Sequence, residues 1–495
     1  MIGISDVLST LYLRLMARFY DREALARWLI VAGLSAILGV GTMLIYFLSR
    51  TQVAMFYGAI LAGVGILALG NVKRWLLGFI IADIAIQFDS YLYWDFELGD
   101  LGTIAGLPIS LSTMFIVVLY GMWFFEAAAT RKPRRERPLL RTGAPLIPYL
   151  AAVALSMITA ARPLLSYFEL VMLIQVFLIT IYVGGALRTR EDVRFVLVIL
   201  MLTLAMEAVV VILSKVSISL PLLTSIASNP ERPTGSFGSP NLAGAYLSVN
   251  TIIAFSVLLM PVRWFERWLA LGSGLLGLTA LVFTLSRGGW VAFAIASVVF
   301  IALAWRRGWI PNWFLITLLI VALVGTLPLQ GVIIERLTGD DGGAASDRGA
   351  LMIIALEMVR DRPVLGIGAN NFAAVMPNYI GPDIQQDWIY TVHNKYLLVW
   401  AETGTLGFLG FLFFLFYTLW RGVRTWRFHD RLLSVLGLAI TAAILGHMVH
   451  LQVDIFNARS PVTMLWMLSG LIYALIRIWR DEKAAAPLAR GRPVP

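Results

Sequence analysis

The stretch HNKYLLVWAETGTLGFLGFLFFLFYTLW, residues 393–420, determines how the rest of the chain is interpreted. It opens with a histidine, an amide and a lysine, and it continues as an apolar segment. That segment is long enough to cross the roughly 30 Å hydrocarbon core of a membrane as a helix. The chain has only four histidines, and His393 is one of them. The stretch therefore predicts a membrane helix with a polar start that carries a histidine.

The composition of the whole chain fits a membrane protein. Hydrophobic residues make up 59% of the 495 positions and charged residues only 14%, whereas a soluble domain carries roughly 25% charged residues. Apolar segments recur along the whole length, so we expect no separate soluble catalytic domain. The absence of cysteine excludes disulfides and thiolate metal sites.

Apolar segments of sufficient length predict an all-α fold, a polytopic membrane bundle of about 12–14 transmembrane helices. The predicted spans are 28–47, 53–69, 75–86, 109–125, 146–158, 167–187, 195–213, 242–260, 269–285, 290–305, 313–327, 396–419, 432–447 and 462–476. Arginines interrupt residues 1–27 and exclude a cleavable signal, so this segment is predicted to be an amphipathic arm at the membrane interface.

The distribution of arginine and lysine predicts the orientation of these helices. With the N-terminus in the cytosol, the loops on that side include TRKPRRERPLLR (130–141) and RGVRTWRFHDR (421–431), which are strongly basic. Short loops on the other side, such as IFNARSP (455–461), are acidic or nearly neutral. The net charge of +10 is therefore a topology signal and an attraction to anionic membrane lipids, and we expect no nucleic-acid partner.

This topology divides the chain into segments with different expected roles. The expected order is a cytosolic interfacial arm (1–27), the first transmembrane helices (28–130), a basic cytosolic loop (131–144), further transmembrane helices with arginine-bearing external turns (145–329), one large external loop containing short helices (330–395), the last transmembrane helices (396–479) and a cytosolic tail (480–495).

Three arginines stand out because the predicted topology puts them on the external side with His393. Arg232 lies in NPERPTGSFGSPNLAG (229–244), Arg287 lies in TLSRGGW (284–290), and Arg348 lies in the large loop. Arginine at a membrane boundary is costly unless an anion or the lipid head groups meet it. The sequence therefore predicts an anion-binding face on the external side.

Glycine spacing predicts a close helix contact next to His393. In a helix that starts at His393, Gly404 comes about three turns later and shares its face, and Gly407 and Gly410 continue the stripe. Small residues let membrane helices approach closely, which would hold the histidine rigidly, as acid–base chemistry requires. The alternative is an interfacial histidine beside glycines that serve packing only.

A second polar face is predicted near the end of span 432–447. His447, His450 and Asp454 have the i, i+3 and i+7 spacing of one helix face. They are predicted to line a channel for the acceptor or to relay a proton. A polar seam satisfied inside the bundle is the alternative.

Three further charges lie singly inside predicted spans. Asp83, Glu169 and Glu207 are costly at such positions and are candidates for function by default. The sequence does not indicate which residues pair with them, so they are assigned to packing or helix pairing.

Four segments together resemble the bacterial O-antigen ligases and polymerases. HNKYLLVWAETGTLG (393–407) fits a signature of histidine, an amide, nine residues and Gly-x-x-Gly. TLSRGGWVAF (284–293) and RPTGSFGSPNLAGAYL (232–247) resemble the two arginine-bearing external turns of that family. SDRGALMIIALEMVRDRPVLGIGANNF (346–372) resembles the amphipathic helix and the P-x-x-G-x-G turn of its large periplasmic loop. The resemblance covers roughly residues 232–410.

The resemblance implies a multi-pass glycosyltransferase of the bacterial cytoplasmic (inner) membrane, with its active site facing the periplasm. The donor would be a glycan on undecaprenyl diphosphate. The acceptor would be a saccharide hydroxyl on the lipid A core, on a growing glycan or on a protein. Neither a cofactor nor a metal would be needed.

The resemblance also implies roles for individual residues. His393, Arg232 and Arg287 would be catalytic, with His393 as the general base and the arginines on the diphosphate. A histidine that is neutral near pH 7 can take a proton from an attacking hydroxyl, and arginine binds phosphate oxygens in two-pronged fashion. The expected substrate-binding residues are Arg348, Asn394, Asn241, His450 and Asp454.

Two other functions stay open from the sequence alone. Asp95 and Glu97, in the outside loop DSYLYWDFELGD (89–100), imitate the carboxylate pair that holds a divalent metal in another class of lipid-linked glycosyltransferases. A transporter or flippase of lipid-linked saccharides would suit the number of spans. Transporters often contain internal repeats and helices broken at mid-membrane, and neither is evident in the sequence.

Overall fold

The computed structural model describes residues 71–96, 103–129, 139–216, 231–317, 344–380 and 390–489, together with residues 320, 330–331 and 334. The predicted interfacial arm, spans 28–47 and 53–69 and most of span 313–327 lie outside the described residues. The chain divides into two compact units. One comprises residues 1–80, 88–90 and 109–136, and the other comprises residues 81–87, 91–108 and 137–495.

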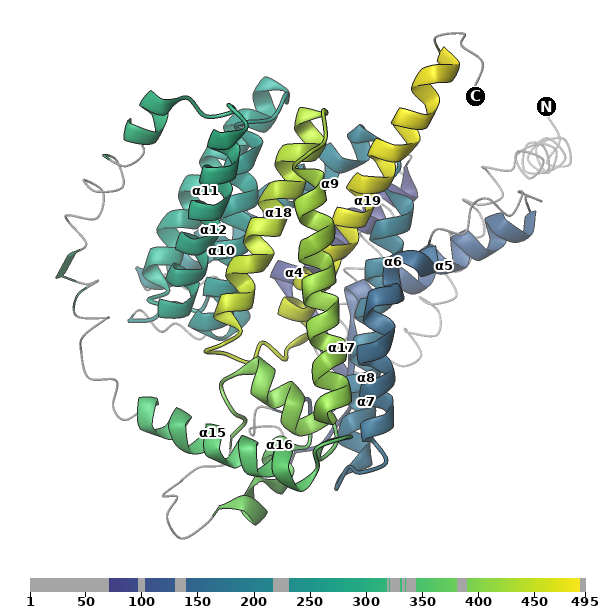
Figure 1. The fold of residues 1–495 in the computed structure, drawn as a ribbon, viewed down its shortest axis with the longest axis vertical. Helices are drawn as coiled ribbons and strands as arrows, with labels where there is room; N and C mark the ends of the chain where they lie inside the picture. The colour runs from purple at the N-terminus through teal and green to yellow at the C-terminus, as the bar shows by residue number, and fades with distance from the viewer. Residues whose placement is uncertain are drawn as a thin grey trace, which may run out of the picture. The chain divides into compact units, whose positions relative to one another are not determined.

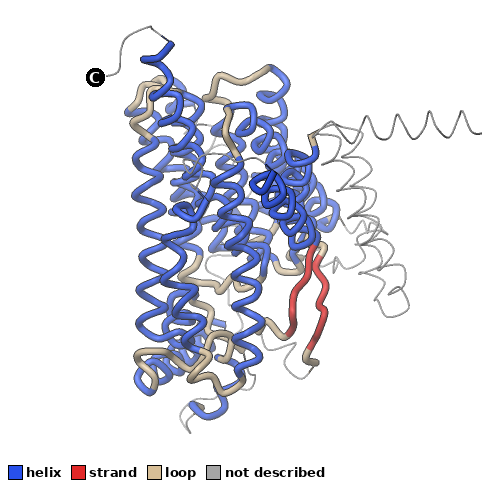
Figure 2. Tube along the Cα trace, turned by 90° about the vertical axis from the view of Figure 1, so that its right-hand side faces the viewer, coloured by secondary structure: helices blue, strands red, loops and turns tan. Residues whose placement is uncertain are grey.

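The first unit contains α5 (Leu111–Ala129) and the first turns of α4 (Val72–Ile86). Between these helices, β1 (Asp89–Trp94) pairs with β2 (Gly106–Ser110) in a two-stranded sheet (Figure 2). This hairpin was not predicted, because its aromatic residues alternate over a stretch too short to separate from a polar loop. It is the only sheet among the described residues.

The second unit is a helical bundle (Figure 1). Its helices are α6 (Leu139–Gly143), α7 (Ile147–Ser156), α8 (Pro163–Ala186), α9 (Arg190–Lys215), α10 (Pro240–Val257), α11 (Trp264–Phe283), α12 (Arg287–Arg306), α15 (Ala344–Asp361), α16 (Phe372–Val375), α17 (Lys395–Thr425), α18 (Arg431–His450) and α19 (Arg459–Ala489). Single turns of 3₁₀ helix lie at Ala144–Leu146, Gly235–Phe237 and Met376–Tyr379.

Seven of the described helices are long and apolar enough to cross a membrane, namely α8, α9, α11, α12, α17, α18 and α19. This confirms the prediction of an all-α, multi-pass membrane protein. The predicted total of about 12–14 spans includes segments outside the described residues and stays a prediction. Two predicted spans are too short to cross on their own: α4 has 15 residues and α7 has 10, against the roughly 20 that a crossing needs.

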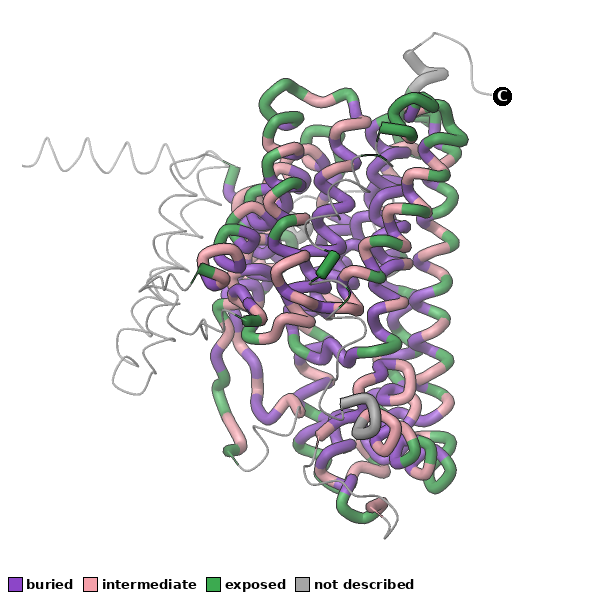
Figure 3. Tube along the Cα trace, turned by 90° about the vertical axis from the view of Figure 1, so that its left-hand side faces the viewer, coloured by how far each residue is buried: buried purple, intermediate pink, exposed green. Residues whose placement is uncertain are grey.

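Burial separates central from peripheral helices in this unit (Figure 3). In the most apolar 18-residue stretch of α18, 89% of the residues are buried, whereas in that of α12 only 28% are buried. Lipid supplies no hydrophobic force between helices, so close contact depends on small residues. Gly437 of α18 lies against Thr425 of α17, and Gly446 lies against the backbone of Ala292 in α12. Because α18 touches helices on several sides, its apolar surface is covered by protein.

Consecutive helices alternate in direction, so their termini gather at two ends of the bundle (Figure 1). We call the end where α10, α12, α17 and α19 begin and α18 stops the site end. The opposite end, where α9, α11 and α18 begin, is the basic end, because its connections carry the arginines of segments 187–190, 261–264 and 424–431. Helices α15 and α16 lie beside the start of α17, at the site end.

Helix α17 departs from the predicted geometry. It begins at Lys395, and the side chain of Asn394 caps it by accepting hydrogen bonds of 3.0 Å from the backbone N–H groups of Tyr396 and Leu397. His393 therefore precedes the helix. At Gly404 the backbone turns to φ +63° and ψ −171°, which interrupts the helix. The prediction that His393 and Gly404 share one continuous helix face is therefore wrong.

The interruption exists because another segment docks into it. The backbone N–H groups of Ile367 and Gly368 donate to the carbonyls of Ala401 and Glu402, at 3.0 and 2.9 Å. On the other side of the break, the N–H of Thr405 donates to the carbonyl of Pro363 at 2.8 Å. A side chain at position 404 would collide with the carbonyl of Val364. The broken helix thus exchanges its own hydrogen bonds for bonds to the 363–368 turn, which keeps its backbone groups satisfied.

The rest of the glycine stripe packs as predicted. A β-carbon on Gly410 would lie 2.9 Å from the backbone nitrogen of Tyr149, in helix α7, and one on Gly407 would lie 3.5 Å from the side chain of Ala152. The prediction of close backbone contact along this part of α17 is confirmed, with α7 as the neighbour.

Candidate active site

Four of the predicted site residues converge at the site end from four different elements. His393 precedes α17, Asp454 lies in the connection between α18 and α19, Asn241 lies in the first turn of α10, and Arg348 lies near the start of α15. The side chain of Asn241 is hydrogen-bonded to the carboxylate of Asp454. The charges of Asp454 and Arg348 both act on the imidazole of His393. These residues are up to 213 positions apart in sequence, from Asn241 to Asp454.

The surroundings of His393 favour its neutral form. Its ring stacks on that of Tyr390, with centroids 5.1 Å apart and planes 21° apart. Burial lowers the pKa of His393 from its usual value of 6.5; the Asp454 carboxylate raises it, and the Arg348 guanidinium lowers it further. Its Nδ1 atom is buried and has no hydrogen-bond partner among the described residues. The neutral imidazole can therefore accept a proton from an incoming group.

Asp454 is held firmly beside this imidazole. It is buried, and its Oδ1 accepts a hydrogen bond of 2.8 Å from the backbone N–H of Ile455. Burial raises the pKa of Asp454, whereas that hydrogen bond, His393 and Asn241 lower it. A carboxylate in this position can stabilise the imidazole of His393 electrostatically once it is protonated.

The predicted face of His447, His450 and Asp454 is not one helix face. Helix α18 ends at His450, and the chain then turns, so Asp454 lies outside the helix. The turn carries Asp454 toward His393. His450 is buried against the ring of Phe456, 4.7 Å between centroids, and against Gly288. His450 therefore packs inside the bundle, and its contact with substrate stays a prediction.

Arg287 occupies the first residue of α12, after the helix cap provided by Ser286. Two adjacent glycines allow this helix end to lie close to its neighbours: Gly288 contacts His450 of α18, and Gly289 contacts the backbone of Gly244 in α10. Arg287 is thereby placed at the site end, between the helices that carry Asn241 and His450.

Arg232 lies in the turn that leads into α10, at the end of that helix where Asn241 also lies. The turn is fixed by Glu207 of α9, whose carboxylate accepts hydrogen bonds from the backbone N–H and the hydroxyl of Ser236, at 3.0 and 2.7 Å. The backbone at Gly235 has φ +58° and passes directly against that carboxylate. That Arg232 and His393 act on the same substrate is part of the proposal below.

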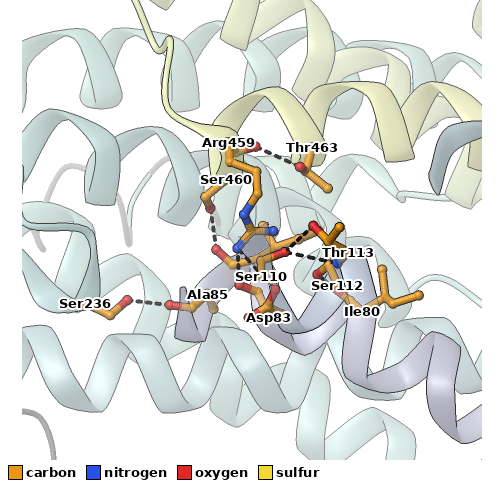
Figure 4. A network of polar contacts seen from close by, with 11 residues as sticks. Ile80, Asp83, Ala85, Ser110, Ser112, Thr113, Ser236, Arg459, Ser460 and Thr463 are labelled. Carbon is orange, nitrogen blue, oxygen red and sulfur yellow. Dashed lines mark hydrogen bonds and ion pairs between the residues drawn. The ribbon is translucent and has the colours of Figure 1, made fainter. Parts of the chain in front are cut away.

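The structure gives partners to the charges that seemed isolated in sequence. Asp83 pairs with Arg459 at 3.1 Å, and their side chains are only 2% and 4% exposed (Figure 4). Glu207 binds Ser236, as described. The carboxylate of Glu169 lies near enough to Lys395, the residue that begins α17, to act electrostatically on its ammonium. Each partner is at least 29 positions away, so no local pattern indicates it.

The outside carboxylates of the metal-dependent alternative are only partly described. The backbone N–H of Asp95 donates to the carbonyl of Ala105 at 2.8 Å, beside the β1–β2 pair. Glu97 lies outside the described residues. In the described part of the chain, no group of three or more histidine, aspartate or glutamate side chains gathers as metal ligands would. This alternative stays untested.

Comparison with known families agrees with the resemblance drawn from the sequence. Residues 272–412 match the family described as O-antigen ligase. The matched segment includes Arg287, Arg348, His393 and the Gly404 break, whereas Arg232, Asn241 and Asp454 lie outside it. A comparison with curated proteins finds no match. The matched segment supports, in general terms, a membrane glycosyltransferase of the O-antigen ligase or polymerase type.

Proposed function

Given an O-antigen ligase segment at residues 272–412, we propose that the protein transfers a glycan from undecaprenyl diphosphate to a saccharide hydroxyl. The acceptor is on the lipid A core, a growing glycan or a protein. The reaction takes place at the site end, which faces away from the cytosol across the bacterial inner membrane. The arginines at the basic end support this orientation.

The observation that carries the proposal is that Asp454 and Arg348 lie close enough to act electrostatically on His393, whose burial favours the neutral imidazole. The acceptor hydroxyl attacks the anomeric carbon of the donor sugar, and its proton passes to the imidazole of His393. The bond between that carbon and the diphosphate oxygen breaks, and the diphosphate leaves as an anion. Asp454 stabilises the imidazolium that has formed.

Arg287 and Arg232 are proposed to bind the leaving diphosphate. Negative charge builds on the diphosphate as the sugar departs, so cationic groups placed there stabilise the transition state more than the bound donor. Arg287 begins α12 at the site end, and Arg232 lies in the turn fixed by Glu207. Asn241 and Arg348 are proposed to contact the substrate, and Asn394 to hold the start of α17 through its cap. No metal takes part in this proposal.

The test is transfer by the purified protein in detergent, from undecaprenyl-diphosphate-linked glycan to added acceptors, with and without a strong chelator. Detergent abolishes vectorial transport, so only an enzyme gives product. Product that survives chelation supports the proposal. Loss on chelation with rescue by magnesium or manganese favours the site built on Asp95 and Glu97. Absence of product with every acceptor, combined with movement of lipid-linked saccharide across sealed vesicles, would establish the transporter instead.

A further inference from the structure

A buried cationic side chain stands two residues after His393. Lys395 is only 7% exposed, and its ammonium donates a hydrogen bond to the side-chain carbonyl of Asn457. The carboxylates of Glu169 and Glu402 both act on it electrostatically. We call these four residues the Lys395 cluster. None of them was assigned a role from the sequence, except that Glu169 was thought to serve packing.

The cluster joins three parts of the fold at Lys395, which lies two residues after His393. Glu169 belongs to α8, Lys395 and Glu402 belong to α17, and Asn457 belongs to the α18–α19 connection. Burying a charge costs several kcal/mol unless partners surround it, so the position of the ammonium is set by all of them. The backbone N–H of Lys395 also lies 2.9 Å from the carbonyl of Leu451 and 3.2 Å from that of Asp454. Lys395 therefore ties the residues beside His393 to the connection that carries Asp454.

Glu402 connects the Lys395 cluster to the large loop. Its carboxylate accepts a hydrogen bond of 3.0 Å from the backbone N–H of Phe372, and its carbonyl accepts one of 2.9 Å from Gly368. Gly368 belongs to the 363–368 turn that docks into the break at Gly404, and Phe372 begins α16, which follows that turn. The helix break, the docked turn and the ammonium of Lys395 are thus parts of one connected structure.

A small cavity adjoins the cluster. It has a volume of about 20 Å³ and is lined by residues that include Glu169, Lys395, His447 and Asn457. Glu169 Oε2 and His447 Nδ1 are buried and have no hydrogen-bond partner among the described residues. This volume suits one water molecule, which needs two to four polar neighbours. The cavity supplies both the space and the polar groups.

We propose that Lys395 is a positioning residue: together with Glu169, Glu402, Asn457 and one water molecule in the adjoining cavity, it fixes the segment that places His393 near Asp454. The assignment of a catalytic consequence rests on the function proposed above for His393. In this proposal the cluster supports the site and contacts neither the donor nor the acceptor.

The first experiment compares Lys395→Met with the double variant Lys395→Met/Glu169→Gln in the purified full chain. The single variant leaves two buried carboxylates without their cation and is expected to lose thermal stability. The double variant removes one charge of each sign and is expected to recover much of that stability. If the cluster positions His393, kcat of the double variant stays about 100-fold low, the effect of a misplacement near 1 Å, while KM for the donor is unchanged. Recovery of kcat together with stability would overturn the positioning role.

Arg477→Met is the matched control. Arg477 is also a cationic side chain partly enclosed by the bundle, donating to the carbonyl of Leu187, but it lies at the basic end. Its loss is expected to lower thermal stability and to leave kcat unchanged. An equal loss of kcat in this variant would show that any destabilisation reduces turnover, and would overturn the proposal.

A second readout needs no activity, so it separates this proposal from the function. Diethyl pyrocarbonate modifies neutral imidazoles, and mass spectrometry gives its rate at each histidine. The exposed His429 at the basic end serves as an internal reference. In the folded double variant, the rate at His393 should rise at least several-fold relative to His429. An unchanged ratio would show that the cluster does not hold His393, whether or not the protein is a transferase.

Discussion

The two ends of the bundle use charged side chains in different ways. At the basic end the ion pairs are largely exposed: Arg190, whose side chain is 51% exposed, lies 2.8 Å from Asp430 and 2.9 Å from Glu482. At the site end exposed pairs such as Arg360 with Glu357 also occur, but buried charges are added to them, as in the pair of Asp83 with Arg459 and the ammonium of Lys395. Exposed pairs are worth about 0–1 kcal/mol, whereas a buried charge costs much more to accommodate.

The difference indicates what each end contributes. Arginines that reach water at the basic end suffice to orient the helices in a membrane, and their exact partners matter little. Buried polar groups at the site end must be positioned by specific partners, since each would otherwise destabilise the fold. Such specific positioning is expected where a reaction depends on geometry, and His393, Asp454 and Asn241 come together at this end.

The sharpest stability contrast is between Asp83→Asn and Arg190→Gln. Asp83→Asn removes a negative charge 3.1 Å from the buried guanidinium of Arg459 and should cost about 3–5 kcal/mol. Arg190→Gln removes exposed pairs and should cost less than about 1 kcal/mol. Thermal unfolding of both purified variants gives the comparison. Equal losses would contradict the division between the two ends.

The two ends of α12 provide a comparison within one helix. Arg287→Lys keeps the charge but loses the planar fork that binds phosphate oxygens, and we expect about a 100-fold loss of transfer, with Arg287→Ala worse. Arg232→Lys should behave alike, and Arg348→Ala should do less harm. Arg306, exposed at the other end of α12, is the control. Its lysine variant should transfer normally, and a loss there equal to that of Arg287→Lys would refute a specific role.

Two glycines with similar φ contrast a position with an extended ψ and close neighbours with a position in open space. Gly404 has φ +63° and abuts the carbonyl of Val364, whereas Gly308 at the basic end has φ +69° and open space, with nothing within 4 Å of the position that a β-carbon would occupy. Gly308→Ala should cost about 1–2 kcal/mol from strain alone. Gly404→Ala should cost more in thermal stability and should also lower transfer, because it displaces the docked 363–368 turn. Identical behaviour of the two variants would mean that the docking contributes nothing.

The smallest expected effect is a shift of the acid limb in the pH profile of transfer, and this shift has opposite signs in two variants. Because the pKa of His393 is lowered below 6.5, transfer should be constant near pH 7–8 and fall as the pH drops through a value below 6.5. Asp454 raises that pKa, so Asp454→Asn should move the acid limb to lower pH. Arg348 lowers it, so Arg348→Ala should move the limb to higher pH. Profiles of kcat/KM against pH test both signs, and shifts in the same direction would contradict the arrangement.

The sequence predicted the helices well, since apolar length alone indicates them. Spans 167–187, 432–447 and 462–476 correspond to α8, α18 and α19 with ends that differ by a few residues or turns. The site was predictable in part: His393, Arg348, Asn241 and Asp454 were singled out from motif and spacing, and they do converge. Their roles in catalysis remain predictions.

What the sequence did not predict depends on contacts between distant segments. The break at Gly404 exists because the 363–368 turn replaces the hydrogen bonds of the helix, and periodicity cannot indicate such a partner. Asp454 faces His393 only because α18 stops at His450. The Lys395 cluster assembles from positions 169, 395, 402 and 457, which share no local pattern.

The central claim is that His393 acts as the general base, and the most direct measurement is transfer by His393→Ala beside wild type and His429→Ala. All three proteins are compared at equal amounts of folded, membrane-inserted protein, with undecaprenyl-diphosphate-linked glycan as the donor. Removal of a general base typically costs about 10²–10⁴-fold in rate, so His393→Ala should form almost no product, while His429→Ala should match wild type. Near-normal transfer by His393→Ala would contradict the account.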